Sequence, residues 1–512
     1  MIADYHAHAL TPFENSTHHF EALVERLSGT KAKVLPHGAL EEVIAGEGRE
    51  LMRLLLEDHL ALRSHEERRS ERVVPVAADE IPRERARDSS RSLRSVFGDV
   101  RVHRLSWIAP GVPGLHPMDA ELNLTGDLYS IGVRRLVAQK AVRCSYDMVI
   151  EELSGELGKP VPKRQVLQLA LRAAEDFDAF YDGREGITPC EGDDLVLMSF
   201  DGKGVVMRLE GLRPSTRAAA EKGKHKLRHR LSRGEKANRK RMAAVAAVWT
   251  SSTDARTVDD IVREPAAGST SPRPRPRRRP RARNKRVWAH LDRPMASVID
   301  EAFVEALRRD PDKSRTWVVL VDGDKSLRRQ VERAARKHGV DVVLVLDIVH
   351  VLEYLWKAGW ALFGKEDPKA EGWVTERLRR LLRGQVSGVA AGMRRSATLR
   401  KVTGTRREAV DRCANYLLKR KGMARYDDYL ASGYPIATGV IEGACRHLIK
   451  DRMDITGARW GLEGAESILR LRALRSSGDF DEYWLFHQRQ EYDRNHRPLY
   501  DTAHCPPLRL VA

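Results

Sequence analysis

Apolar positions recur at two different spacings along this chain, and the change of spacing divides it into regions. Over residues 1–90 they recur every three or four residues, as in amphipathic helices. Region 91–190 opens with apolar and polar positions alternating around a Gly-Asp step, which predicts a β-hairpin. Two short helices separated by a glycine-bearing turn follow and indicate a helix-turn-helix. The second of them begins at Lys163 and Arg164, which we expect to contact DNA.

Short apolar runs in region 191–363 predict the buried strands of a sheet. The predicted strands cover 195–200, 242–249, 287–291, 317–321 and 342–347. Helical spacing predicts helices over 295–309, 325–337 and 348–363. Proline and arginine alternate over residues 272–281, so we expect a flexible basic loop over residues 250–286.

The remainder of the chain shows helical spacing and no strand pattern. Residues 364–430 predict a helical insertion rich in arginine and leucine. Residues 431–478 predict a further core helix, and 479–512 are interpreted as a C-terminal tail. The fold class that these elements predict is α/β, with a mostly helical N-terminal region that contains the hairpin.

Two of the predicted strands end in an acidic residue followed by glycine. The first ends at Asp201-Gly202 and the fourth at Asp322-Gly323. A carboxylate next to a buried strand is held rigidly at the rim of the sheet. Two such carboxylates on neighbouring strands can share a divalent cation, because hard cations prefer oxygen ligands.

Net charge and composition indicate which class of molecule such a site would bind. The chain has 512 residues, a formal net charge of +18 and a pI near 9.8, which favours nucleic acid over a membrane surface. Its five cysteines contain no C-x-x-C pair, so we expect reduced thiols and no zinc site. No apolar run approaches about 18 residues, and no signal peptide is evident. We therefore expect a cytoplasmic, nucleoid-associated protein.

The order of the elements is that of a ribonuclease-H-like fold: three strands, a helix, a strand, a helix and a strand, then a helical insertion. In that fold acids stand on the first strand, after the fourth strand and on a late helix. Asp201 and Asp322 fill the first two positions. Glu442 fills the third, in a helix that Thr438 is expected to cap.

Three carboxylates can hold two Mg²⁺ ions, for which Mn²⁺ can substitute. One ion activates a water or a 3′-hydroxyl, and the other stabilises the leaving oxygen in a displacement at phosphorus.

Several long motifs, in the same order, resemble DDE insertion-sequence transposases of the ISKra-four family, which are Mutator-like. The motifs cover residues 199–208, 231–242, 321–324, 347–356 and 438–447. The resemblance extends over about residues 91–490 and implies DNA strand cleavage and joining at element ends. It implies a metal-binding triad of Asp201, Asp322 and Glu442. Asp347 is the rival for the second position, and His350 is a helper or structural residue.

One departure from the family concerns the N-terminal hairpin. Relatives carry cysteine pairs flanking it, as in a zinc ribbon, whereas residues 105–118 contain no cysteine. A zinc-stabilised module is therefore not expected here, while the helix-turn-helix prediction is unaffected.

The partners expected are double-stranded DNA, as element terminal repeats and as target, and a second copy of the chain. Two ends must be brought together, so we expect at least a dimer. The basic residues expected at the DNA are Lys163, Arg164, Lys203, Arg239, Lys240, Arg241, Arg446, Lys450, Arg452 and Arg459. The late cations lie near Trp460, which either stacks on DNA or belongs to the core.

Two other functions fit the same residues. The chain could be a transposase-derived DNA-binding protein without catalysis, or a metal-dependent nuclease that cuts without joining. Intact acids at all three positions favour catalysis, and the N-terminal reading module together with the helical insertion favours transposition over plain cleavage.

Overall fold

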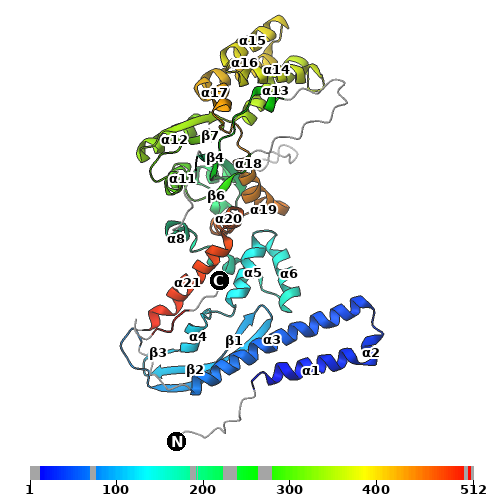
Figure 1. The fold of residues 1–512 in the computed structure, drawn as a ribbon, viewed down its shortest axis with the longest axis vertical. Coiled ribbons are helices and arrows are strands. Elements are labelled where there is room, and N and C mark those ends of the chain that lie inside the picture. The colour runs from blue at the N-terminus through cyan, green and yellow to red at the C-terminus, as the bar shows by residue number, and fades with distance from the viewer. Residues whose placement is uncertain are drawn as a thin grey trace. The chain divides into compact units, whose positions relative to one another are not determined.

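The computed structural model describes residues 12–69, 77–184, 192, 194–222, 239–262, 280–500 and 505–508 (Figure 1). The chain forms two compact units, each described here by itself. Unit 1 consists of residues 1–183 and 479–512, and unit 2 of residues 184–478. The helices of the described residues include none that is both long and apolar enough to cross a membrane.

Unit 1 opens with three helices, as the three- and four-residue spacing predicts. These are α1 (Glu14–Ser28), α2 (Thr30–Lys33) and α3 (His37–Arg69). The carboxylate of Asp58 on α3 accepts hydrogen bonds from Asn15 Nδ2 at 2.9 Å and from the Ser16 amide at 2.8 Å, which joins α1 to α3.

The predicted β-hairpin is confirmed, and its strands are longer than the alternation indicates. β1 (Arg85–Ser95) pairs antiparallel with β2 (Gly98–Ala109), and β3 (Val112–Leu115) adds a third strand that was not predicted. Ser95 pairs with Gly98, so the turn lies at residues 96–97 rather than at the Gly-Asp step. Gly98 has a φ of 130°, which L side chains rarely adopt.

The two helices of the predicted helix-turn-helix are also present. α6 (Tyr146–Leu157) begins after Ser145, whose hydroxyl caps it, and ends at Gly158 in the left-handed conformation. α7 (Lys163–Arg172) follows Pro162 and buries Val166, Leu169 and Ala170. The neighbouring helices of this part of unit 1 are α4 (Pro117–Glu121), α5 (Ile131–Ala141) and α8 (Phe177–Asp182).

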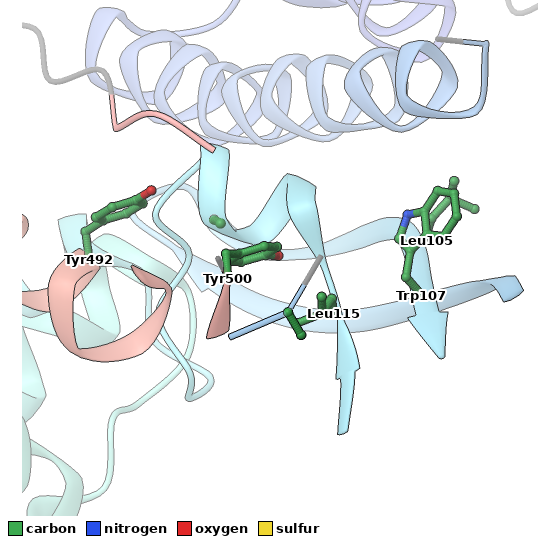
Figure 2. Packing of buried hydrophobic residues seen from close by; sticks show 7 residues of the cluster. Leu105, Trp107, Leu115, Tyr492 and Tyr500 are labelled. Carbon is green, nitrogen blue, oxygen red and sulfur yellow. The ribbon is translucent and has the colours of Figure 1, made fainter. Parts of the chain in front are cut away.

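The C-terminal residues belong to unit 1 and are more than the tail that we expected. They form α21 (Phe480–Asn495) and the short helix η5 (Arg497–Leu499). Tyr492 and Tyr500 share an apolar cluster with side chains of β2 and β3 (Figure 2). The buried members of this cluster are Ala77, Leu105, Trp107, Leu115, Ala120, Tyr492 and Tyr500. Residues from the two ends of the sequence therefore complete one core.

A buried polar network holds α21 in place. Asp176 accepts a hydrogen bond from His487 Nδ1 at 2.6 Å and two from the Arg494 guanidinium at 2.6 and 3.0 Å. Burial alone would raise the pKa of Asp176, but His487 and Arg494 outweigh it, so the pKa lies below its ordinary value.

Unit 2 is built on a mixed sheet of five strands. They are β4 (Leu195–Val206), β5 (Lys240–Ser251), β6 (Arg283–His290), β7 (Trp317–Val321) and β8 (Val342–Leu346). Their order across the sheet is β6-β5-β4-β7-β8. The pairs β6-β5 and β5-β4 are antiparallel, while β4-β7 and β7-β8 are parallel.

Two expectations about this sheet are corrected. β4 does not end at Asp201: it continues to Val206, because β5 pairs with it along its whole length. The expected loop over 250–286 is shorter at both ends, since β5 reaches Ser251 and β6 begins at Arg283. A short helix, α10 (Val258–Ile261), lies within that region. Residues 263–279 are outside the described part of the chain, as are residues 231–238 of the second motif.

Helices surround the sheet and extend beyond it. α11 (Met295–Arg309) lies against β5 and β4, and α20 (Leu462–Ser477) against β6. Two more, α12 (Lys325–His338) and α13 (Ile348–Phe363), follow β7 and β8. Between β4 and β5 stand η1 (Leu209–Gly211) and α9 (Pro214–Lys222).

The helices predicted over residues 364–430 are present, and all of these residues are described. It contains α14 (Lys369–Leu382), α15 (Val386–Leu399), α16 (Gly404–Lys419), η2 (Lys421–Met423) and α17 (Tyr426–Ala431). α13 packs against α14 and α16 (Figure 1).

The predicted core helix over 431–478 is divided in the structure into several elements. α18 (Gly439–Ala444) is followed by a π-helical turn, η3 (Cys445–Lys450), then by α19 (Asp451–Met453), η4 (Ile455–Gly457) and α20. π-turns are rare and occur frequently at functional sites.

Candidate active site: a row of carboxylates across three strands

The register of the parallel strands places three acidic residues side by side. Ser199 pairs with Leu320, so two residues further on Asp201 and Asp322 stand at the same level of β4 and β7. Val321 pairs with Leu346, so Asp322 and Asp347 stand at the same level of β7 and β8. Neighbouring strands lie about 4.8 Å apart. The three residues therefore stand in one row across the sheet.

Asp201 is held within a paired strand instead of at a strand end. It is half-buried and opposite Val245 of β5. Its Oδ1 accepts a hydrogen bond from the amide of Gly202 at 2.7 Å, and its Oδ2 accepts one from the Cys445 thiol at 3.1 Å. Burial and the neighbouring Asp201 charge raise the pKa of Cys445 far above its ordinary value, so the thiol keeps its proton.

Asp322 lies in a tight turn between β7 and α12. Its Oδ1 accepts a hydrogen bond from the Asp324 amide at 2.8 Å, and Asp324 in turn caps α12 through the Leu327 amide at 2.8 Å. Between them Gly323 adopts a φ of 85°, in the left-handed region. The Asp322 side chain is half-exposed, so one of its oxygens is accessible.

Two side chains of α16, in the helical region after α13, contact this turn and hold it in place. The Tyr416 hydroxyl donates to the Asp322 carbonyl at 2.7 Å, and Arg420 Nε donates to the Gly323 carbonyl at 2.6 Å. Tyr416 stacks on Tyr354 of α13 with ring centroids 3.9 Å apart, and the Arg420 guanidinium lies 4.2 Å from the Tyr416 ring. No sequence pattern indicated a role for Tyr416 or Arg420.

Gly323→Ala is expected to destabilise this turn and to slow any chemistry that depends on Asp322. A Cβ at this position would lie 2.3 Å from Arg420 Nε and 2.8 Å from Leu346 Cδ1. The left-handed backbone costs an L residue a further 1–2 kcal/mol or so. We expect a total loss of about 1–3 kcal/mol in unfolding free energy, measured by thermal or urea unfolding. Gly372→Ala is the control, because that helical glycine has open space at its Cβ and should be neutral or slightly stabilising.

Asp347 is fully buried and its oxygens are committed to the protein. It caps α13 by accepting from the Val349 amide at 3.0 Å, and it accepts a hydrogen bond from the Thr438 hydroxyl. Thr438 was expected to cap α18, but the structure corrects this: its side chain makes no cap bond to that helix. His350 Nε2 lies 4.0 Å from Asp347 Oδ2. Asp347 is therefore less available to a cation than the half-exposed Asp322.

Glu442 belongs electrostatically to the same site. Its side chain reaches the surface on α18. Partial desolvation raises the pKa of Glu442, and the negative charges of Asp347, Glu353 and Asp201 raise it further, against the lowering effect of His350. A carboxylate surrounded by others in this way gains from a bound cation, which relieves their mutual repulsion.

The carboxylate oxygens of Asp201, Asp322 and Glu442 are hard donors of the kind that Mg²⁺ or Mn²⁺ prefers. In the structure these oxygens do not converge on one point as a complete set of metal ligands. Within the described residues, one group of three His, Cys, Asp or Glu residues has its ligand atoms within 4.8 Å of one another: His290, Asp292 and Glu466. Glu466 accepts hydrogen bonds there from His290 Nδ1 and, at 2.8 Å, from the Leu291 amide. These bonds fasten β6 to α20.

Most of the basic residues predicted at the DNA reach the surface. Those exposed are Lys163, Arg164, Lys203, Lys240, Arg446, Lys450 and Arg459, and Arg239 is half-buried. Lys163 also forms an ion pair with Asp147 of α6 at 2.7 Å. Their role at DNA stays a prediction.

Two of the residues predicted at the DNA have partners inside unit 2. Arg241 donates to the carbonyls of Leu291 at 2.8 Å and Gly211 at 3.1 Å, so its guanidinium is used inside unit 2. Arg452 is 2% exposed and lies 4.8 Å from the ring of Trp460, which is itself buried. The alternative in which Trp460 belongs to the core is the one that the structure supports.

Comparison with known proteins adds no family to these observations. The chain matches none of the family models, and it matches none of the curated proteins.

Proposed function

We propose that this chain is a metal-dependent DNA transposase that cleaves and joins strands through a ribonuclease-H-like core. The observation that carries the proposal is the row of Asp201, Asp322 and Asp347 on adjacent strands, with Glu442 within electrostatic reach. The sheet supports the same core, since β4, its first strand along the chain, pairs antiparallel with β5 on one side and parallel with β7 on the other. The net charge of +18 suits a polyanionic substrate.

In this proposal Asp201, Asp322 and Glu442 would hold Mg²⁺ or Mn²⁺, which would supply activation of the nucleophile and stabilisation of the leaving oxygen. Asp347 positions Glu442: it caps α13 and binds Thr438, which fixes the start of α18. Tyr416 and Arg420 hold the turn that carries Asp322. The Cys445 thiol orients Asp201.

The deciding experiment uses labelled duplexes that carry the DNA flanking this gene, incubated with Mg²⁺ or Mn²⁺ and with paired ends. Cleaved and joined product supports the transposase. Cleaved product that is never joined favours a nuclease of the same fold, and tight binding without cleavage favours a repurposed DNA-binding protein. Sedimentation of the complex with paired ends tests the proposal that at least two copies assemble.

Exposed cations near Glu442 provide a separate prediction about phosphate contacts. Lys450→Ala and Arg459→Ala are each expected to weaken duplex binding and to reduce the slope of log K against log salt by about 1, because each removes one phosphate contact. Lys31→Ala, an exposed cation on α2 of unit 1, is the comparison and should leave the slope unchanged. Unchanged slopes in both test variants would remove these residues from the DNA interface.

A further inference from the structure

Tryptophan exposure singles out one face of α13. The chain has nine tryptophans, and seven of them are buried. The two others, Trp356 and Trp360, are neighbours one turn apart on α13, with ring centroids 5.6 Å apart. Trp360 is 37% exposed and Trp356 is half-buried. Exposing aromatic surface is unfavourable, so two adjacent indoles that both reach the surface make this face of α13 a candidate ligand-binding surface.

The two indoles line an open trough of about 480 Å³ along α13. We call it the α13 trough; its lining residues are Val349, Leu352, Glu353, Trp356, Lys357 and Trp360. They recur every three or four residues, so the trough follows a single helix face. Cations stand at its rim: Lys357 pairs with Glu353 at 3.6 Å, and Lys365 Nζ lies 5.9 Å from the Trp360 ring.

The trough borders the proposed active site. The amide of Val349, the first lining residue of the trough, donates a hydrogen bond to Asp347, and His350 follows Val349 in the chain. Glu353, which lines the trough, is close enough to Glu442 for their charges to interact. The trough and the row of carboxylates therefore meet at the start of α13.

We propose that the α13 trough binds an unpaired nucleobase of the DNA strand at the active site, stacked against Trp356 and Trp360. The inference rests on the proposed function and names the state of the substrate: a base outside the duplex, since paired bases have both faces covered. Aromatic side chains stack on every base, while nearby lysines contact the phosphates. A cavity of about 480 Å³ is within the range of small-ligand sites.

A second protein chain is the less suitable occupant. A stable protein interface covers about 800 Å² on each partner. The trough is lined by six residues of a single helix, which is the scale of a ligand rather than of an interface.

The test compares two single strands that share a backbone: an oligothymidylate, and an abasic oligomer of the same length. Affinities are measured by fluorescence anisotropy on the full chain in EDTA, so that nothing is cut. Trp356→Ala and Trp360→Ala are each expected to weaken oligothymidylate binding about tenfold and to leave abasic binding unchanged. Trp360→Phe, which keeps an aromatic face, should stay within about threefold of the wild type.

Leu399→Ala is the matched control, because Leu399 is an apolar side chain on α15 that is 72% exposed and outside the trough. It should change neither affinity. Circular dichroism and thermal unfolding confirm that the tryptophan variants are folded, and Trp360→Phe keeps the test valid if an alanine variant is not.

Equal losses on both oligomers, or no loss on either, would overturn the inference. So would alanine variants that bind oligothymidylate normally but sediment at a lower mass, since the trough would then be a contact between copies. If instead the proposed function is wrong, the wild type would cut no duplex with Mg²⁺ or Mn²⁺. A wrong inference about the trough leaves that cleavage intact.

Discussion

Asp201→Asn is expected to lower magnesium-dependent strand cleavage by about 10³-fold or more while leaving duplex affinity unchanged. Asparagine keeps the size of the side chain and an oxygen that can accept from Gly202, so the fold of β4 is retained. It removes the negative charge that would bind the cation, whose contribution to the transition state is several kcal/mol, and each 1.4 kcal/mol or so is a factor of ten in rate. Single-turnover cleavage of a labelled duplex measures the effect.

The control for this variant is another aspartate of the same sheet region. Asp341→Asn changes an exposed carboxylate just before β8, at the end of that strand opposite Asp347. It should cleave at the wild-type rate. Cleavage by Asp201→Asn within about tenfold of the wild type would contradict a metal-binding role for Asp201.

The same assay separates the two rivals for the second metal position. Asp322→Asn should match Asp201→Asn in rate and remain as stable as the wild type, since its side chain is half-exposed. Asp347→Asn should lower the melting temperature, because Asp347 is fully buried and bonded to Val349 and Thr438. A large rate loss in Asp347→Asn without any change in stability would instead favour Asp347 as a metal ligand.

Asp176→Asn is expected to destabilise unit 1 by about 1–3 kcal/mol, because it weakens the buried hydrogen bonds from His487 and Arg494, although Arg494 keeps Glu175 and Glu491 as partners. Asp481→Asn, on the same helix α21, is the comparison. Asp481 is 82% exposed and pairs with Arg135 at 2.7 Å, and surface pairs contribute about 0–1 kcal/mol. Hydrogen–deuterium exchange of the α21 amides measures both variants and separates unit 1 from unit 2.

The Asp176 network is expected to stabilise unit 1 less as the pH falls. The folded-state pKa of Asp176 lies below its ordinary value, so its contribution is fully present above the unfolded pKa, about 3.9. It is lost as the pH falls through the folded-state pKa. Protection of α21 should therefore drop at lower pH in the wild type and respond less to acid in Asp176→Asn. Equal acid sensitivity in the two proteins would contradict the role given to Asp176.

Where one hydrophobic pattern dominates an element, its first and last residues could be predicted from the sequence. The strand Trp317–Val321 and the helices Met295–Arg309 and Ile348–Phe363 have the predicted bounds, because an apolar run or a three-to-four spacing admits one secondary structure. β4 was predicted too short because the glycines after Asp201 were interpreted as a turn. Pairing with β5 keeps them extended, which only the tertiary structure shows.

The acids of the candidate site could be predicted, but not what holds them. Asp201, Asp322, Asp347 and Glu442 stand beside readable strand or helix patterns. Their partners come from positions far along the chain: Tyr416 lies 94 residues from Asp322, and Cys445 lies 244 residues from Asp201. No local pattern encodes such contacts. The burial of Arg452 could not be predicted either, because its charge indicated a surface position.

Because residues 479–500 complete the unit that residues 1–183 begin, that unit cannot close until the last of them has been synthesised. At about 5–20 residues per second, the intervening unit takes roughly 15–60 s to emerge from the ribosome. During that interval the apolar cluster of β2 and β3 lacks Tyr492 and Tyr500, and unit 2, with its carboxylates, has all its residues before unit 1 does. A frameshift late in the gene would thus damage the structure formed by its beginning.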